Sequence, residues 1–376
     1  MTHVFIVNER TFDIHLQYMF AGTGYSTFQP TLNSLLPAKY THENTFTGMI
    51  ADISKVRNGD KVLFYVTGCK KFFGVFEIQG SPFFEPSNTN YLGAVLDKYL
   101  PFRVKIKPYR VFAEGIPEQI ALDDITAINK PYEMCWSMIY RKLTGMRGCS
   151  FLTDFEMSKM ESLLMLINNN QTLTGKNFCY DYTNYSVSIS AIHSAYQGLT
   201  NQSLSINNRL SVVNGSHEGH VQAYITQNFD KDPLLIAKLF PANTFKIWIG
   251  NEVICSVGEK RIDVLTIAET DREIQIRVIE LKDERPLSSL ITNQIPWYIK
   301  WVDQYIVPNL LVNNKPITIV PTIFAYAHKR NTKNKRAFDA AINDFNSQVT
   351  TMGINASVEN IECIYYDRTQ NPIKIY

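Results

Sequence analysis

The cysteines of this 376-residue chain lack any close spacing. They stand at positions 69, 135, 149, 179, 255 and 363, and no two are separated by only two residues. A zinc site built on paired cysteines is therefore not expected. The ordinary interpretation is that the six cysteines act as small, buried apolar residues of a protein in a reducing compartment.

Long apolar runs and a strong charge bias are also missing. The beginning, MTHVFIVNERTF, turns polar too soon for a signal peptide, and no later apolar run is long enough to span a bilayer. The 37 basic and 35 acidic residues nearly cancel, so overall charge does not indicate a nucleic-acid partner. We expect a cytoplasmic protein with no membrane partner.

The length and a hydrophobic content of 45 % predict two folded domains. Residues 1–167 are expected to form an α+β domain, with a turn at Asn58-Gly59-Asp60 and a helix after the capping box of Thr153 and Glu156. Its expected strands are residues 3–7, 61–67, 72–78 and 102–107, the middle two forming a hairpin. Residues 168–214 are rich in Asn, Ser, Thr and Tyr and predict a connector.

The remaining segment, residues 215–376, predicts an α/β domain around a mixed sheet. The expected order is a helix at 218–228, strands at 245–256, 261–268 and 273–282, a helix at about 287–305, a strand at 317–326, a helix at 336–348 and a terminal strand pair.

Three charged residues stand in strands that are otherwise apolar. Asp263 interrupts KRIDVLTI, and Glu280 and Lys282 close IQIRVIELK on one strand face. A hairpin turning near Thr270-Asp271 would bring the two carboxylates together, and a hard cation such as Mg²⁺ would relieve their repulsion. Lys282 would orient water or stabilise negative charge. A surface hairpin with ordinary charges is the alternative.

This pattern resembles the PD-(D/E)xK nuclease superfamily, with Asp263 as its aspartate and Glu280-Leu281-Lys282 as its ExK element. The resemblance covers residues 217–326, including the strand IVPTIFAYA, and is similar to the nuclease domain of archaeal mismatch endonucleases. Ile262 stands where the strict motif has proline. The resemblance further implies Glu218 as an additional acid near the metal. It also implies Gln294 and Tyr298 as a Q-x-x-x-Y helix, which Pro296 should kink or begin.

A second resemblance concerns the first domain. NGDKVLFYVTGCKKFFGVFEI, LPFRVKIKP and WSMIYRKLTGMRGCSFLT resemble the EVE branch of PUA-like β-barrels, related to YTH domains. The resemblance implies a β-barrel that binds nucleic acid and receives a modified or flipped base between aromatic walls. Phe46, Phe72 and Phe73 are the candidate walls of this base pocket, and core packing is the alternative role for each.

Basic residues cluster locally in three groups despite the neutral total. We interpret the first group, together with Arg141 and Lys142 of the second, as contacts to nucleic-acid phosphates, and solvated loops are the alternative. The first group is Lys329, Arg330, Lys333, Lys335 and Arg336. The second contains Arg141, Lys142 and Arg147, and the third Arg103, Lys105, Lys107 and Arg110.

Together these features predict a restriction-type endonuclease that hydrolyses double-stranded DNA with Mg²⁺, for which Mn²⁺ would substitute. The expected metal ligands are Asp263, Glu280 and Glu218, with Lys282 and Gln294 completing the catalytic set. A homodimer is expected, because cutting both strands takes two active sites. The alternatives are a repair nuclease for mismatched or branched DNA and a non-catalytic reader of modified nucleic acid.

Overall fold

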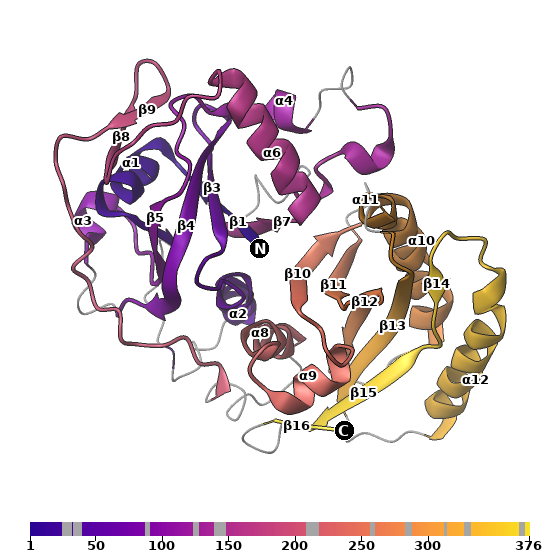
Figure 1. Cartoon of the computed structure of the whole chain (residues 1–376). Coiled ribbons are helices and arrows are strands. Elements are labelled where there is room, and N and C mark those ends of the chain that lie inside the picture. Colours follow the sequence, from indigo (N-terminus) through magenta and orange to yellow (C-terminus); the bar gives the residue numbers. More distant parts are fainter. Residues whose placement is uncertain are drawn as a thin grey trace. The chain divides into compact units, whose positions relative to one another are not determined.

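The chain divides into two compact units between Ser205 and Ile206, each containing a mixed seven-stranded sheet (Figure 1). The computed structural model describes residues 1–24, 32, 40–86, 91–122, 128–138, 148–207, 218–255, 260–282, 288–311, 314–326, 332–367 and 373–376, with backbone alone at 40–42, 44 and 332–334. The predicted combination of α+β architecture with mixed sheets is confirmed. No helix in these ranges is long and apolar enough to cross a bilayer.

The first unit surrounds its sheet with short helices. Its strands are β1 (Thr2–Val7), β2 (Phe20–Thr23), β3 (Lys61–Val66), β4 (Lys71–Phe84), β5 (Phe102–Pro108), β6 (Ile116–Pro117), β7 (Cys149–Leu152), β8 (Phe178–Asp181) and β9 (Ser186–Ile189). Its helices are α1 (Glu9–Tyr18), α2 (Tyr40–Ser54), α3 (Gly93–Leu96), α4 (Glu118–Leu122) and α6 (Asp154–Ile167), with 3₁₀ turns at Pro131–Glu133 and Trp136–Met138. The expected hairpin is β3–β4, and the capping box of Thr153 and Glu156 begins α6 as predicted.

The sheet of the first unit is open, which corrects the expected β-barrel. The strand order is β2-β5-β4-β3-β1-β7, with β6 beside β4. Closing a barrel requires the first and last strands of this path to pair with each other. Among the described residues β2 pairs with β5 and β7 pairs with β1, and the two four-residue edge strands do not pair with each other, although Gly148 before β7 lies beside Thr23 of β2.

Much of the expected connector belongs to the first unit. Strands β8 and β9 form a hairpin, and β8 packs against α1. Tyr180 N donates to Asp13 Oδ1 at 2.9 Å, and the Tyr180 ring meets Phe12 edge-on at 5.4 Å. Asn177 Nδ2 donates to Gln17 O at 2.6 Å. These contacts fix the hairpin on α1, so the first unit extends past the expected boundary at residue 167 to Ser205.

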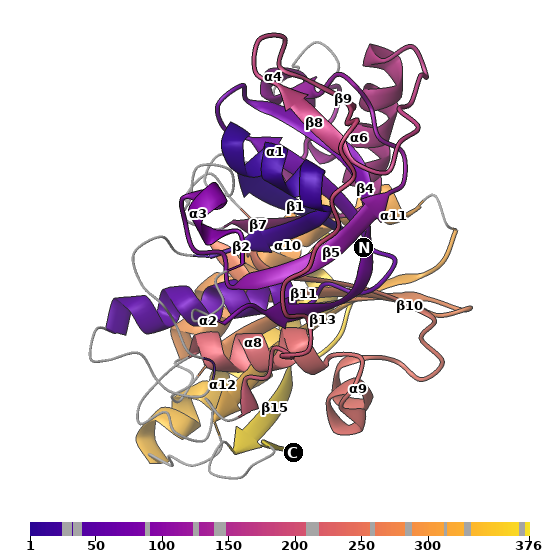
Figure 2. The same cartoon turned by 90° about the vertical axis from the view of Figure 1, so that its left-hand side faces the viewer.

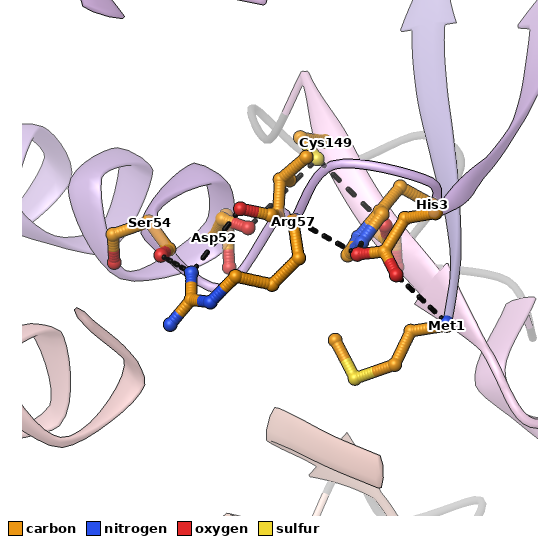
Figure 3. A network of polar contacts seen from close by, with 9 residues as sticks. Met1, His3, Asp52, Ser54, Arg57 and Cys149 are labelled. Atoms are coloured by element: carbon orange, nitrogen blue, oxygen red, sulfur yellow. Dashed lines mark hydrogen bonds and ion pairs between the residues drawn. The ribbon is translucent and has the colours of Figure 1, made fainter. Parts of the chain in front are cut away.

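A buried polar network anchors the beginning of β1. Asp60 Oδ2 lies 2.8 Å from His3 Nε2 and accepts from Arg57 N at 2.8 Å, while Oδ1 accepts from the Met1 ammonium at 2.8 Å. Figure 3 shows Met1, His3 and Arg57 gathered around this network. Arg57 Nη1 donates to Ser54 O at 2.6 Å. Burial alone would raise the pKa of Asp60, but His3 and the ammonium lower it to about 2. The network thus joins β1 to the end of α2 and the start of β3.

His15 is a neutral polar residue within the aromatic core of the first unit. Its ring meets Phe20 at 4.6 Å and Phe64 at 5.5 Å between centroids. The side chain is fully buried, and neither ring nitrogen has a hydrogen-bond partner among the described residues. Burial lowers its pKa well below the ordinary value, and the positive charges of Lys98 and Arg103 act in the same direction.

We expect His15→Leu to stabilise the first unit by about 1 kcal/mol at neutral pH, because it removes two unpaired polar atoms from the core. The unfolded state takes up a proton on His15 near its ordinary pKa, whereas the folded state does so only at lower pH. Wild-type stability should therefore fall as pH drops below about 6.5, and the variant should lose less. Melting curves at pH 7 and pH 5 measure both effects, with the exposed His193→Leu as control. An equal acid sensitivity in wild type and His15→Leu would contradict the prediction.

The second unit follows the predicted order of elements. Its strands are β10 (Lys246–Ile254), β11 (Arg261–Glu269), β12 (Ile274–Lys282), β13 (Ile317–Tyr326), β14 (Ser357–Val358), β15 (Glu362–Asp367) and β16 (Lys374–Ile375). Its helices are α8 (Glu218–Asn228), α9 (Pro233–Leu239), α10 (Ile295–Tyr305), α11 (Val307–Leu310) and α12 (Thr332–Gln348), with a π-helical turn at Leu290–Gln294 and a 3₁₀ turn at Val349–Thr351. Helix α9 was not predicted, and α12 begins four residues earlier than expected.

The sheet of this unit has the order β10-β11-β12-β13-β15-β16, with β14 beside β13. Strands β10 to β12 form an antiparallel meander, while β13 runs parallel to both β12 and β15. Helices α8 and α12 lie on opposite sides of the sheet (Figure 1), and α8 passes in front of β11 and β13 in Figure 2. Helix α8 contacts β10 and β12, which places it over one end of the meander.

Candidate active site

The β11–β12 hairpin brings two carboxylates to one place. Its antiparallel register pairs Val264 with Ile279, so Asp263 and Glu280 occupy the next opposed position, where cross-strand side chains share a face. Asp263 Oδ2 accepts a hydrogen bond from Leu281 N at 2.8 Å. This side chain therefore satisfies a backbone donor just beyond the last paired residues of the ladder.

Both carboxylates lie in a setting that disfavours their charge. Burial raises the pKa of Asp263 well above its ordinary value, and the negative charge of Glu280 raises it further. Burial also raises the pKa of Glu280, more than the neighbouring Lys282 lowers it. Glu280 is only 3 % exposed, and its Oε2 makes no direct hydrogen bond among the described residues, although the nearby Tyr298 hydroxyl lowers the pKa of this carboxyl. The two groups repel each other when both are charged.

Lys282 supplies the positive charge of the site. Its Nζ lies 2.9 Å from Glu280 Oε1 and 3.2 Å from Glu218 Oε1, and it donates to Leu281 O at 2.7 Å. The contact with Glu280 agrees with the shared strand face that their spacing predicted. Burial alone would lower the pKa of Lys282, but Glu280, Glu218 and Asp263 together raise it. Lys282 therefore stays protonated, which suits stabilisation of negative charge rather than action as a base.

The repulsion between the carboxylates gives a stability prediction. A raised pKa in the folded state means that the folded protein gains stability as pH falls towards that pKa and loses it as pH rises. Without metal, we expect Asp263→Asn to raise the melting temperature of the second unit by about 2 to 4 °C at pH 8, which corresponds to about 1 kcal/mol. The gain should shrink by pH 5, where wild-type Asp263 increasingly holds its own proton.

Melting curves in chelator at both pH values test this expectation. The matched control is Asp271→Asn, because Asp271 lies exposed in the turn of the same hairpin. A destabilised Asp263→Asn protein at pH 8 would show that the hydrogen bond to Leu281 outweighs the repulsion.

A set of polar residues that the sequence analysis did not identify holds the strand that carries Asp263. Gln222 on α8 donates through Nε2 to Asp263 O at 2.9 Å and to Glu252 Oε1 at 3.3 Å. Asn251 Nδ2 donates to Gln222 Oε1 at 3.3 Å, and Arg261 Nη1 lies 2.7 Å from Glu252 Oε2. One signal was available, because Gln222 follows Glu218 by four residues and so shares its helix face.

Gln294 and Tyr298 lie next to β11 and contact each other. Tyr298 OH donates to Arg261 O at 2.8 Å, and Gln294 Nε2 donates to Tyr298 OH at 3.4 Å. Burial raises the pKa of Tyr298, as do the charges of Glu280 and Asp263. Pro296 stands in the first turn of α10, directly after the π-helical turn. Of the two predicted placements, a kink within the helix or its first turn, the second is therefore the one observed. The Tyr298 hydroxyl lowers the pKa of Glu280, so Gln294 is linked to the carboxylates through Tyr298.

Glu218 is the third acid near the site. Within the described ranges no three His, Cys, Asp or Glu side chains come together as a metal site. The Glu218 side chain is 44 % exposed and shares the Lys282 ammonium with Glu280, and its charge raises the pKa of Glu280. A pair still fits Mg²⁺, which commonly takes one or two carboxylates and keeps several waters.

The basic residues proposed to contact nucleic acid are only partly described. Arg141, Lys142, Arg147, Lys329 and Arg330 lie outside the described residues, and the side chain of Lys333 does as well. Lys335 and Arg336 are exposed on α12, where Lys335 lies 3.9 Å from Asp339. The parallel register sets Ala325 beside Lys282. Strand β13 therefore ends next to the candidate active site.

The three candidate walls of a base pocket belong to the core of the first unit. Phe46, Phe72 and Phe73 are each at most 1 % exposed. Phe46 packs against Phe102 at 5.2 Å, and Phe73 packs against Phe12 at 5.1 Å. Since no ring face is open to solvent, stacking a base on these residues would require displacing core packing, so core packing is their role.

Comparison with known proteins identified no relative of this chain. No family model matches the chain, and no curated protein shows significant similarity to it.

Proposed function

We propose that this protein is a Mg²⁺-dependent endonuclease that hydrolyses phosphodiester bonds of DNA at the site formed by Asp263, Glu280 and Lys282. The observation that carries the proposal is the buried carboxylate of Glu280. One of its oxygens lies against Lys282, and the other makes no direct hydrogen bond among the described residues, with the Tyr298 hydroxyl as its polar neighbour. Such an oxygen costs free energy unless a cation or donor reaches it.

The donor set fits a hard divalent cation. Asp263 and Glu280 would hold the ion, because both offer carboxylate oxygens on one strand face and repel each other without it. When bound, Mg²⁺ would neutralise charge on the phosphate and activate water for attack. Mn²⁺ would substitute, since it accepts the same oxygen ligands.

The remaining residues would position the chemistry. Lys282 would stabilise the negative charge that develops on the phosphate, because its pKa keeps it cationic. Glu218 would orient Lys282 through their 3.2 Å contact, a role distinct from direct metal binding. Gln222 and Tyr298 would fix β11 through its carbonyls at Asp263 and Arg261, and Gln294 would hold Tyr298.

We further propose that the second unit is a PD-(D/E)xK nuclease domain and that the first is related to EVE and PUA-like domains. Support for the second unit comes from its element order, with the aspartate on the middle strand of the meander and the ExK element at the end of the next. Support for the first is its sequence likeness across β3, β4 and β5. The first unit would read the DNA site or a modified base.

DNA would be held beside the active site by basic residues. The end of β13 lies beside Lys282, and Lys335 and Arg336 are exposed on α12, the next described element of the chain. Such side chains contact phosphates and position a duplex without reading its sequence. A two-fold dimer would supply the second active site needed to cut both strands.

A plasmid cleavage assay tests the proposal. Supercoiled DNA should be nicked and linearised with Mg²⁺ by the wild-type protein, and not by Glu280→Gln. Plasmids with and without methylated bases, together with mismatched and branched duplexes, identify the preferred substrate. Preference for branched DNA would favour a repair nuclease. Binding of modified DNA without any cleavage would reject the endonuclease and favour a reader.

A further inference from the structure

A pocket of about 550 Å³ opens on the surface of the first unit, and the proposed nuclease chemistry uses none of its residues. It lies between β5 and the end of α1, and the segments 175–177 and 194–196 complete its walls. Its volume falls within the range of pockets that bind small organic ligands. All of these walls belong to one compact unit.

Buried polar residues hold the walls in place. Asn177 is 4 % exposed, and its Nδ2 donates to Gln17 O at 2.6 Å and to Ser194 O at 2.7 Å, which joins three segments around the pocket. Tyr196 OH accepts from Arg103 Nη1 at 3.0 Å and donates to Glu85 Oε2 at 2.8 Å. The Tyr196 ring also packs against Phe20, Phe83 and Tyr91, so it forms a fixed wall before any ligand arrives.

The pocket carries positive charge that its own walls do not balance. Lys105, Lys107 and Lys176 line it, and no carboxylate does. Lys107 is neutralised, since its Nζ lies 2.8 Å from Glu77, a residue that also lies 2.9 Å from Lys61. Lys105 and Lys176 make no ion pair with any described residue. The pocket therefore offers two ammonium groups to an anion.

We propose that this pocket binds a nucleotide, with its phosphate at Lys105 and Lys176 and its base against the ring of Tyr18. Lysines bind phosphate as point charges, and tyrosine rings hold bases of any kind by stacking. The same chemistry is offered by a free nucleotide and by one nucleotide of a strand. The proposal does not depend on metal binding or cleavage by the second unit.

Calorimetric titration of the full chain in chelator tests the proposal. Adenosine 5′-monophosphate should bind, and adenosine, which lacks the phosphate, should bind at least about tenfold more weakly. The double variant Lys105→Gln/Lys176→Gln should weaken nucleotide binding at least about tenfold. Lys61→Gln is the matched control, because Lys61 pairs with Glu77 outside the pocket and should leave binding unchanged.

A second variant separates the pocket from general surface charge. Ala195→Trp keeps every lysine but fills the cavity, so it should also remove binding. Equal affinity for adenosine and its monophosphate, or unchanged binding in both the double variant and Ala195→Trp, would overturn the proposal. Displacement of the mononucleotide by an oligothymidylate of higher affinity would identify a strand as the source. Weaker displacement would identify a free nucleotide.

Discussion

Replacing Lys282 with alanine is expected to slow DNA cleavage by about a hundred- to a thousandfold while DNA affinity changes only a few-fold. The reason is the position of its ammonium group, which lies 2.9 Å from Glu280 Oε1 and keeps its charge although it is largely buried. An interaction that is strongest when charge develops on the phosphate affects kcat more than binding. Single-turnover cleavage rates and equilibrium DNA binding, measured on the same duplex, separate the two quantities.

Lys315→Ala is a closely matched control for this experiment. Lys315 Nζ lies 2.7 Å from Glu269 Oε1 at the opposite end of β11. Its side chain is 22 % exposed, against 24 % for Lys282. Loss of an equally buried ion pair at that end should leave cleavage intact. Near-normal cleavage by Lys282→Ala, or equal losses in both variants, would remove Lys282 from the catalytic set.

Removal of divalent metal is expected to abolish cleavage, and Mg²⁺ or Mn²⁺ should restore it. Ca²⁺ should support DNA binding without cutting. In the absence of DNA, Mg²⁺ at a hundred times its Kd should stabilise the second unit by about 2.7 kcal/mol, because the ion binds only the folded pair of carboxylates. The stabilisation should be larger at pH 8 than at pH 5, since the raised pKa of Asp263 makes a proton compete with the ion at low pH.

Cleavage assays with chelator and added metals measure the first effect, and melting curves measure the second. In Glu280→Gln, neither the cleavage rate nor the melting temperature should respond to Mg²⁺. Glu362→Gln, on strand β15 of the same sheet, should still cleave DNA when Mg²⁺ is added. Activity that persists in excess chelator would exclude a metal mechanism at this site.

The main features of the candidate site could be predicted from the sequence because they are local. Asp263 and Glu280 stand in alternating strands joined by a short turn, so strand periodicity alone brings them to one face. The same periodicity predicted the contact between Glu280 and Lys282. The order of helices and strands from α8 to β13 also follows from local patterns, and it is confirmed except that α9 was not predicted.

Features that depend on distant contacts were not predictable in the same way. The same alternation of apolar and polar residues occurs in strands of a barrel and of an open sheet, so nothing local indicated that β2 and β7 do not pair. The segment around Tyr180 has weak periodicity, and its packing on α1 depends on pairing with Asp13. Gln222 was missed for a related reason, because its partners Asp263, Asn251 and Glu252 come from two other strands.

The place of β1 within its sheet affects the order in which the protein folds. This first strand lies between β3 and β7, and α1 beside it bonds to Tyr180, 167 residues away from Asp13. Pairing over such separations is slow, because loops must close before the contacts form. The β10–β12 meander pairs only successive strands and closes short loops. The first unit would thus complete its folding after the second. One edge of β1 would stay unpaired until β7 pairs with it.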